Sequence, residues 1–312
     1  MSEKIENLLG EDRTFDPPSS IVENANATQE WFDLANEDRL AYWQKQALER
    51  ITWYKEPKEI LDDSDAPFYK WFKDGELNLS YNCLDRHLET DADRIAFYWE
   101  GEPGDSQEIT YQDLYERVCK LSNGLKELGV KKGDRIAIYL GMTPEIVISM
   151  LACARIGAVH SVVFGGFSAE ALADRINDAE AKVVITADGA WRRGDIVPLK
   201  QNVDDSLKLT DHIESVIVVK RTENEVTMVD GRDYWYSELV DKQEADCEPE
   251  VMNAEDMLYI LYTSGTTAKP KGIVHTQAGY LTGVTTTHSA VFDVKEDDIY
   301  WCAADCGWVT GH

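Results

Sequence analysis

Residues 257–272 read MLYILYTSGTTAKPKG, and this stretch decides the fold that the sequence predicts. Positions 258–262 are apolar and aromatic and end at turn residues, a pattern typical of a buried strand. Beyond the strand, Gly265 permits a backbone that turns successive N–H groups to one side, and the hydroxyls around it add donors. Lys269 and Lys271 supply positive charge. The stretch therefore predicts a strand followed by a loop that holds phosphate.

The residues expected to hold phosphate are Thr263, Ser264, Gly265, Thr266, Thr267, Lys269, Lys271 and Gly272. They do not form a Walker A loop, because counting from Gly265 the second glycine of G-x-x-x-x-G-K-[ST] falls on Pro270. From composition alone, the alternative is a plain turn rich in serine, threonine and glycine with exposed lysines.

Two stretches resemble known families. TSGTTAKPKG closely resembles the phosphate-binding signature of the adenylate-forming superfamily, which includes acyl-CoA synthetases, luciferases and the adenylation domains of peptide synthetases. Ala268 departs from it, since the family usually has glycine there, and a left-handed backbone would disfavour alanine by about 1 kcal/mol. Residues 71–88, WFKDGELNLSYNCLDRHL, resemble the N-terminal segment of acetyl-CoA synthetases and their short-chain relatives.

Strand and helix patterns alternate through the middle of the chain. We expect strands at 135–140, 160–164, 183–187 and 216–219, helices at 111–128, 144–156, 169–181 and 276–289, and a hairpin around 230–232. The first helix has a capping-box-like start at Thr110 and Asp113 and a stop at Gly129, and Ser168 caps a later one. Such alternation implies a mostly parallel sheet flanked by helices.

The predicted fold class is therefore α/β, the N-terminal portion of the large domain of adenylate-forming enzymes, with an aromatic-rich N-terminal cap. We expect a flexible tail over residues 1–26, an acetyl-CoA synthetase-type segment over 27–85 and an AMP-binding domain over 86–312. The resemblance also implies later ribose- and adenine-binding segments and a C-terminal domain with a catalytic lysine beyond His312. This chain is expected to be an N-terminal fragment, inactive alone.

Ligands of parallel sheets bind at the carboxyl ends of strands, and two strand ends stand out. Gly165 and Gly166 follow one strand, where a ligand would meet bare backbone, although a tight turn explains them equally well. The other end carries Arg192, Arg193, Gly194 and Asp195, whose arginines suit a phosphate. The alternative there is a solvated turn with the arginines paired to Asp188 and Asp195.

The resemblance implies that both places contact CoA. The family has a basic residue where Asp195 stands, which puts one CoA phosphate contact in question and gives Arg193 the role of substitute. It also implies that Trp308, Val309 and Thr310 line the acyl pocket, with Thr310 near CoA as well. On composition alone, core packing explains Trp308 and Val309.

The chain is strongly acidic, with 31 basic and 58 acidic residues and a net charge of −27. Nucleic acid is not an expected partner, because the chain has no basic stripe. ATP and CoA are polyanions that such a surface repels unless salt screens it, and the Debye length falls from about 10 Å at 0.1 M to about 3 Å at 1 M. A salt-rich, halophilic cytoplasm and an ordinary acidic cytosolic protein are the two interpretations.

The cysteines, the N-terminus and the apolar runs exclude some classes of protein and of site. The six cysteines are scattered, several of them in apolar runs, and no histidines stand at zinc-ligand spacing from Cys302 and Cys306, so reduced core cysteines are expected. The N-terminus lacks a hydrophobic signal core, and the longest apolar runs are too short to span a membrane. A soluble, cytoplasmic protein without a membrane partner or a metal site of its own is predicted.

The resemblance implies an acetate–CoA ligase that forms AMP. Acetate would attack Mg-ATP to give an acetyl-adenylate and diphosphate, and the CoA thiolate would then displace AMP. Mg2+ would enter with ATP, and no catalytic side chain of this chain is expected. A propionate or other short-chain acyl-CoA synthetase is the nearest alternative, and a non-catalytic nucleotide- or partner-binding fragment is an alternative of another class.

Overall fold

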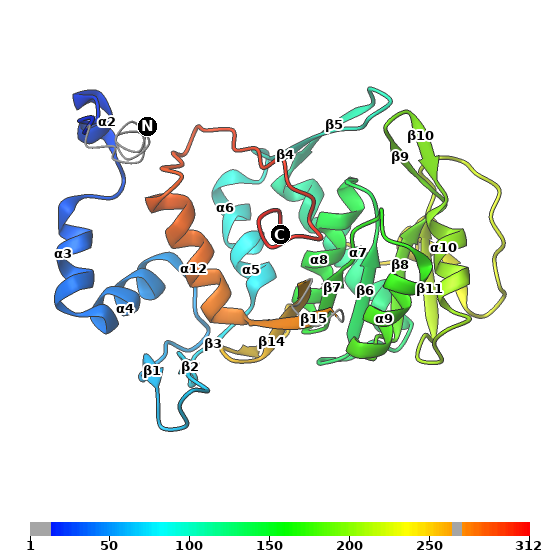
Figure 1. Ribbon diagram of the computed structural model, residues 1–312, viewed down its shortest axis with the longest axis horizontal. Coiled ribbons are helices and arrows are strands. Elements are labelled where there is room, and N and C mark those ends of the chain that lie inside the picture. Colours follow the sequence, from blue (N-terminus) through cyan, green and yellow to red (C-terminus); the bar gives the residue numbers. More distant parts are fainter. Residues whose placement is uncertain (1–13, 264–269) are drawn as a thin grey trace, which may run out of the picture.

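The computed structural model describes residues 14–263 and 270–312. Within them, the largest sheet has seven strands in the order β12-β11-β8-β6-β7-β14-β15 (Figure 1). In that order, the strands span Asp233–Trp235, Ser215–Val219, Val183–Ala187, Arg135–Tyr139, Val159–Val162, Met257–Thr263 and Lys271–Thr276. Neighbours pair in parallel from β12 to β14, and only β15 is antiparallel. The predicted α/β class with a mostly parallel sheet is confirmed.

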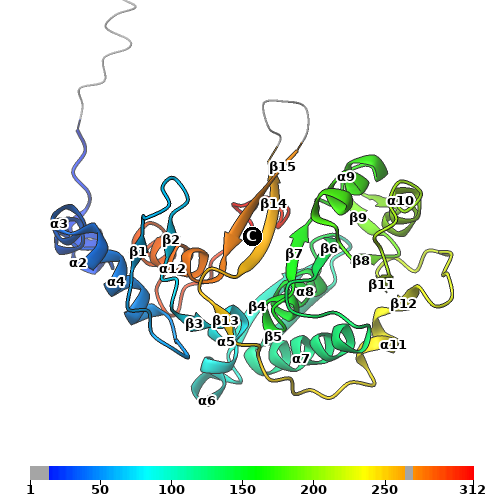
Figure 2. The ribbon, with the colours of Figure 1, turned by 90° about the horizontal axis from the view of Figure 1, so that it is seen from below.

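Helices cover both faces of this sheet. One face carries α7 (Tyr111–Glu127), α8 (Pro144–Arg155) and α11 (Tyr236–Val240), and the other carries α9 (Ala169–Ala179) and α10 (Leu199–Ser206) (Figure 2). Strands β8 and β11 are consequently buried along their whole length. Their unbroken apolar runs, VVITA and SVIVV, are what a strand covered on both faces requires.

Local signals start and stop these helices. Thr110 and Asp113 form the expected capping box of α7, in which each side chain accepts a hydrogen bond from the other residue's backbone N–H. Ser168 caps α9 by accepting from the N–H of Ala171. Helix α9 stops at Ala179, two residues before the predicted end, because Glu180 adopts a left-handed φ of 48°.

The hairpin predicted around residues 230–232 is wrong. Gly231 does turn the chain, with a φ of 76°, but the strands on either side, β11 and β12, run parallel. The chain crosses over before β12, and Asp233 at its start is buried among cations. Its carboxylate lies 3.0 Å from Nζ of Lys200 and 2.5 Å from Nε of Arg232.

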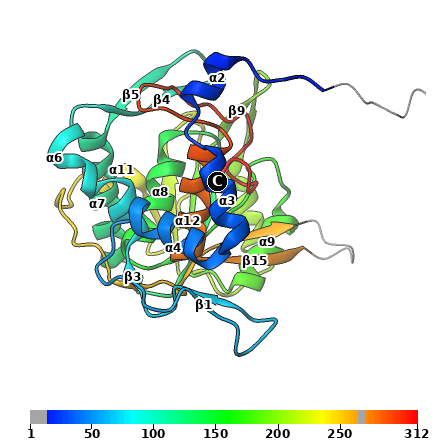
Figure 3. The same ribbon diagram turned by 90° about the vertical axis from the view of Figure 1, so that its left-hand side faces the viewer.

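The N-terminal part packs away from the large sheet. Helix α4 (Arg39–Arg50) packs against α12 (Gln277–Ala290), which follows β15, and α3 (Gln29–Glu37) packs against α4 (Figure 3). Helix α2 (Ser19–Asn24) precedes α3. Helix α2 lies inside the segment predicted to be a tail. The remaining short elements are β1 (Leu61–Asp62), β2 (Lys70–Trp71), β3 (Glu76–Leu77), α5 (Leu79–Cys83), a 3-10 turn (Asp85–His87), α6 (Leu88–Asp91), β4 (Ile95–Glu100), β5 (Ser106–Thr110), β9 (Ala190–Arg192), β10 (Asp195–Val197) and β13 (Met252–Asn253).

A polar clasp joins the N-terminal helices to the segment that follows α12. The ammonium of Lys295 donates to the carbonyl of Asn24, to the side-chain oxygen of Asn26 and to Asp293, at 2.6 to 2.8 Å. Asn26 in turn donates its backbone N–H to Asp293 at 2.8 Å. These contacts fix α2 and α3 against residues more than 260 positions away in the sequence.

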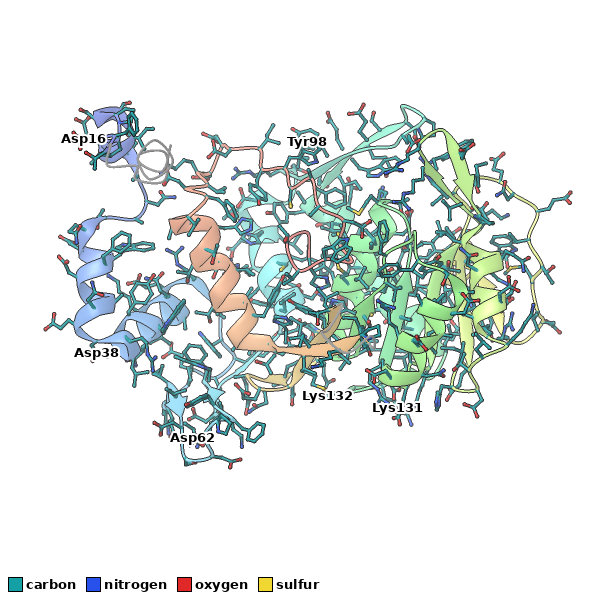
Figure 4. All side chains as sticks on the ribbon, in the orientation of Figure 1. Asp16, Asp38, Asp62, Tyr98, Lys131 and Lys132 are labelled. Carbon is teal, nitrogen blue, oxygen red and sulfur yellow. The ribbon has the colours of Figure 1, made fainter. Side chains whose placement is uncertain are left out.

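Acidic side chains project from the outer edge of the N-terminal part, where Figure 4 labels Asp16, Asp38 and Asp62. Asp38 also has a local role, because its carboxylate accepts from the backbone N–H groups of Leu40 and Ala41 and so caps α4. None of the helices in the described part of the chain is both long and apolar enough to cross a bilayer.

Candidate functional site

A cavity of about 410 Å³ opens at the carboxyl ends of β6 and β7. It brings together segments from far apart in the chain: the tip of the β4–β5 hairpin, residues 140–143 after β6, residues 164–166 after β7, the β9–β10 hairpin, Arg221 and Asp305. Three predicted CoA residues, Gly165, Gly166 and Arg192, line it. Arg193, Gly194, Asp195 and Thr310 are not among its lining residues.

The two glycines leave room for close neighbours. A Cβ on Gly165 would lie 2.9 Å from the carbonyl oxygen of Leu140, and one on Gly166 would collide with the guanidinium of Arg192. The backbone that follows β7 therefore passes directly against the chain after β6 on one side and against Arg192 on the other. The tight turn is present, closed by a hydrogen bond of 3.0 Å from the N–H of Phe167 to the carbonyl of Phe164.

Arg193 and Gly194 form the tip of a hairpin that the sequence did not predict. Their φ angles are 55° and 83°, and Arg192 pairs with Asp195 across the two-residue turn. Positive φ at both positions is the conformation that matches the twist of a tight hairpin. The N–H of Gly194 donates to Oε1 of Glu102 at 2.5 Å, so the tip of β9–β10 is tied to the tip of β4–β5.

The arginines of this hairpin do not pair with the acids nearest to them in sequence. Within residues 14–263 and 270–312, no ion pair joins Arg192 or Arg193 to Asp188 or Asp195. Asp188 instead accepts backbone N–H groups, including those of Gly189 and Arg221. The guanidinium of Arg192 lies over the ring of Phe164, 4.7 Å from its centroid, which leaves its N–H groups available at the cavity wall.

Sequence reasoning missed four charged residues of the cavity, Glu100, Glu102, Arg221 and Asp305. Arg221 binds Asp105 through two hydrogen bonds of 2.7 and 3.0 Å and stacks on Trp99 at 5.0 Å. Burial raises the pKa of Asp305, against the opposing effects of the Gly307 N–H and the charge of Arg192. Only Arg221 had a signal in the sequence, because it comes just after a predicted strand.

Trp308 and Val309 are not packed in the core. Trp308 is 49% exposed and Val309 is 61% exposed, so the core-packing alternative is wrong for the described chain. The ring of Trp308 lies 6.4 Å from that of Phe164 and 6.5 Å from that of Phe167. Thr310 is exposed beside them. The predicted acyl-pocket residues therefore stand next to the residues that follow β7.

The predicted phosphate loop is described only at its two ends. Thr263 closes β14, Lys271 and Gly272 open β15, and Thr263 pairs directly with Lys271. Ser264, Gly265, Thr266, Thr267 and Lys269 lie outside the described residues. Close to Thr263, the guanidinium of Arg175 sits between the rings of Phe167 and Tyr262, at 4.5 and 5.5 Å.

A histidine cluster lies behind this edge of the sheet. Nε2 of His160 is 3.0 Å from Nε2 of His312, and Nδ1 of His312 faces the carbonyl of Cys306 at 3.2 Å. Neutral rings satisfy both contacts only if His312 carries its proton on Nδ1 and His160 on Nε2. Burial lowers the pKa of His312 to about 4 and that of His160 well below its usual value. His275 stacks on Tyr259 at 4.5 Å.

Metal-binding groups are not assembled in the part of the chain that the structure describes. No three side chains of His, Cys, Asp or Glu are placed there to hold one ion. Cys302 instead donates its thiol to the carbonyl of Thr310 at 3.3 Å, and Cys306 is buried. The cavity itself presents basic, acidic and aromatic side chains.

Comparison with known proteins places the chain in a family. Residues 84–312 match the family model described as AMP-binding enzyme, and residues 17–83 match the model described as acetyl-coenzyme A synthetase N-terminus. The chain is 58% identical to the acetyl-coenzyme A synthetase of Streptomyces avermitilis and 55% identical to that of Pasteurella multocida. These matches cover 100% and 98% of this chain and 48% of each relative.

A third relative is similar over less of its own length. The acetyl-coenzyme A synthetase of Mycolicibacterium smegmatis is 53% identical, over 96% of this chain and 32% of the relative. The chain thus spans about half the length or less of the curated relatives that it matches. Since one family model covers most of the sequence, the chain belongs to the AMP-binding enzyme family and opens with an acetyl-coenzyme A synthetase-type N-terminal segment.

Proposed function

We propose that this chain carries the CoA site and the ATP phosphate loop of an acetate–CoA ligase that forms AMP. The observation that carries the proposal is the cavity lined by Gly165, Gly166 and Arg192, in which the guanidinium of Arg192 stacks on Phe164 and forms no ion pair within the residues that the structure describes. Relatives that match the whole chain are named acetyl-coenzyme A synthetase, which supports acetate, ATP and CoA as substrates.

In the proposed reaction, a carboxylate oxygen of acetate attacks the α-phosphorus of ATP, which enters as its magnesium complex. Diphosphate leaves, and an acetyl-adenylate is formed. The CoA thiolate then attacks the acetyl carbonyl, and AMP leaves. The first step moves negative charge between oxygens, and the second moves it from the thiolate sulfur to a phosphate oxygen of AMP, so positioning and fixed donors supply most of the acceleration. No side-chain nucleophile of this chain takes part.

The proposal gives each cluster one task. The ATP phosphates would be held by Thr263, Ser264, Gly265, Thr266, Thr267, Lys269, Lys271 and Gly272, and CoA by Gly165, Gly166, Arg192, Arg193, Gly194, Asp195 and Thr310. Trp308, Val309 and Thr310 would line the acyl pocket. The exposed ring of Trp308, which lies near Phe164 and Phe167, supports this proposal, because Phe164 also lines the cavity proposed for CoA.

Asp195 is the weak point of the CoA site, since an anionic side chain beside the hairpin tip repels phosphate. Arg193, two positions earlier, supports the site instead, because the turn that it forms with Gly194 is exposed and Arg193 forms no ion pair within the described chain. A propionate or other short-chain synthetase uses the same chemistry with a larger acyl pocket, and a binding fragment without activity uses the same cavity without turnover.

The net charge of −27 motivates a further part of the proposal, that the protein works in a salt-rich cytoplasm. At molar salt the Debye length is about 3 Å, so ATP and CoA are repelled only by acidic side chains in direct contact with them. Raising KCl from 0.1 to 2 M should then strengthen CoA binding or leave the affinity unchanged. A steady loss of affinity over this range would instead indicate an ordinary acidic protein.

The test of the site is the binding of CoA to the 312-residue chain, measured by isothermal titration calorimetry. Replacing Arg192 by Ala should weaken binding by about tenfold or more, because a charged hydrogen bond to phosphate is lost. Arg39→Ala is the matched control, since Arg39 is exposed on α4 and remote from the cavity. Equal affinity of Arg192→Ala and the parent chain would overturn the assignment.

A further inference from the structure

Two hairpin tips meet at the entrance of the proposed CoA cavity. One is the turn Arg193–Gly194 of β9–β10, and the other is the segment from Gly101 to Asp105 that joins β4 to β5. They are joined by one hydrogen bond, from the N–H of Gly194 to Oε1 of Glu102 at 2.5 Å. Glu102 also lines the cavity. A carboxylate thus occupies a backbone donor at the place proposed for an anionic ligand.

The chemistry of this contact resembles that of a bound phosphate. A backbone N–H in a turn of positive φ, with two arginines beside it, is an anion-binding arrangement. Charged acceptors form the stronger hydrogen bonds with such N–H groups. Glu102 supplies the acceptor from within the protein, so an incoming phosphate oxygen has to displace it to reach the same donor.

The remainder of the entrance does not depend on Glu102. The β4–β5 tip is anchored separately by the pair of hydrogen bonds between Asp105 and Arg221, at 2.7 and 3.0 Å, and by the stacking of Arg221 on Trp99. Glu102 itself is exposed, so releasing it costs one hydrogen bond and exposes no apolar surface. The carboxylate can therefore leave Gly194 while the hairpin stays in place.

We propose that Glu102 limits the affinity of the CoA site: its carboxylate competes with a CoA phosphate for the N–H of Gly194 and so lowers the affinity for CoA. This inference rests on the proposed function of the cavity. It assigns to the β4–β5 tip, for which the sequence predicted no role, an influence on how tightly the site binds CoA.

The test compares variants at position 102 in CoA titrations of the 312-residue chain. Glu102→Ala removes both the charge and the acceptor and should raise CoA affinity by about tenfold. Glu102→Gln keeps an acceptor oxygen but loses the charge, and we expect a gain of about threefold. Glu108→Gln is the matched control, because it removes the same charge from an exposed site on β5 of the same hairpin, and its affinity should equal that of the parent chain.

The outcomes separate this inference from the proposed function. If Arg192→Ala loses binding while Glu102→Ala gains none or binds more weakly, the CoA site stands and the competition is overturned. If Glu108→Gln gains as much as Glu102→Gln, general repulsion explains the effect and the competition is again overturned. If neither the parent chain nor Glu102→Ala binds CoA, both the site and the competition fail. Circular dichroism confirms that Glu102→Ala keeps the fold.

Discussion

Arg155 and Asp85 form a two-fold ion pair, with hydrogen bonds of 2.8 and 2.9 Å, in which only 1% of the arginine side chain is exposed. The guanidinium also donates to the carbonyl of Cys247 at 2.5 Å. Both residues lie in the part of the chain matched to the AMP-binding enzyme model, Asp85 near its start and Arg155 at the end of α8. The pair therefore fixes the start of the AMP-binding part to α8 through a buried charge.

Removing one partner of this ion pair should destabilise the fold. Asp85→Ala leaves the guanidinium of Arg155 buried without its counter-charge, and we expect the free energy of unfolding to fall by about 3 to 5 kcal/mol. Urea denaturation followed by tryptophan fluorescence measures the change. The control is Asp205→Ala, which breaks an exposed contact with Lys208 and should leave the urea midpoint unchanged. An unchanged midpoint for Asp85→Ala would show that other contacts hold the start of the AMP-binding part against α8.

The histidine cluster should make stability depend on pH. The folded pKa of His312, at about 4, lies below its unfolded value of about 6.5, so the unfolded state binds more protons in between. Stability is then complete above about pH 6.5 and falls as the pH drops toward 4. The slope of unfolding free energy against pH between 6.5 and 4.5 should be smaller for His312→Phe. His212→Gln, at an exposed site, should keep the parent slope, and equal slopes for all three chains would exclude the cluster as the cause.

Substitution by alanine should have different effects on CoA affinity and on stability at the two neighbouring glycines of the cavity. Gly166→Ala meets the movable guanidinium of Arg192, so it should lower CoA affinity by about tenfold with a stability change below about 1 kcal/mol. Gly165→Ala meets the carbonyl oxygen of Leu140, which is backbone, and should cost about 1 to 3 kcal/mol of stability. Titration with CoA and thermal unfolding of both variants measure the two effects. A stability loss of equal size in both would contradict the distinction.

Arg193 should show a conflict between stability and binding. Its φ of 55° is unfavourable for a side chain by about 1 kcal/mol, so Arg193→Gly should raise the free energy of unfolding by up to that amount. If Arg193 substitutes for the cation that the family has at position 195, the same variant should bind CoA more weakly. Thermal unfolding and calorimetry on one preparation measure both. Unchanged CoA affinity would leave Arg193 with no part in the site.

Sequence patterns predicted the local structure well and the long-range structure less well. The capping box of Thr110 and Asp113 and the cap at Ser168 are contacts between residues three positions apart, so their signal is contained in the sequence. The pairing of β11 with β12 is not, because the crossover between them has no periodic pattern and the turn at Gly231 resembles that of a hairpin.

The candidate site shows the same division. Gly165, Gly166 and Arg192 follow strands in the sequence, and for that reason they were predicted to lie at a site. Glu102 contacts Gly194 across 92 positions, and no local sequence pattern indicates that contact. The hairpin at Arg193 and Gly194 was missed because arginine is uncommon at positive φ, so the pair lacks the Asn-Gly signature of such turns.

The clasp between Lys295 and the segment Asn24–Asn26 has a consequence for synthesis of the protein. These partners are separated by about 270 positions, so the ribosome must add almost all of that chain before the contact can form. At about 5 to 20 residues per second, the delay is on the order of tens of seconds. During that time α2 and α3 lack their contacts with Lys295. Phe32 of α3 is exposed even in the finished fold. The N-terminal helices therefore reach their final contacts only late in synthesis.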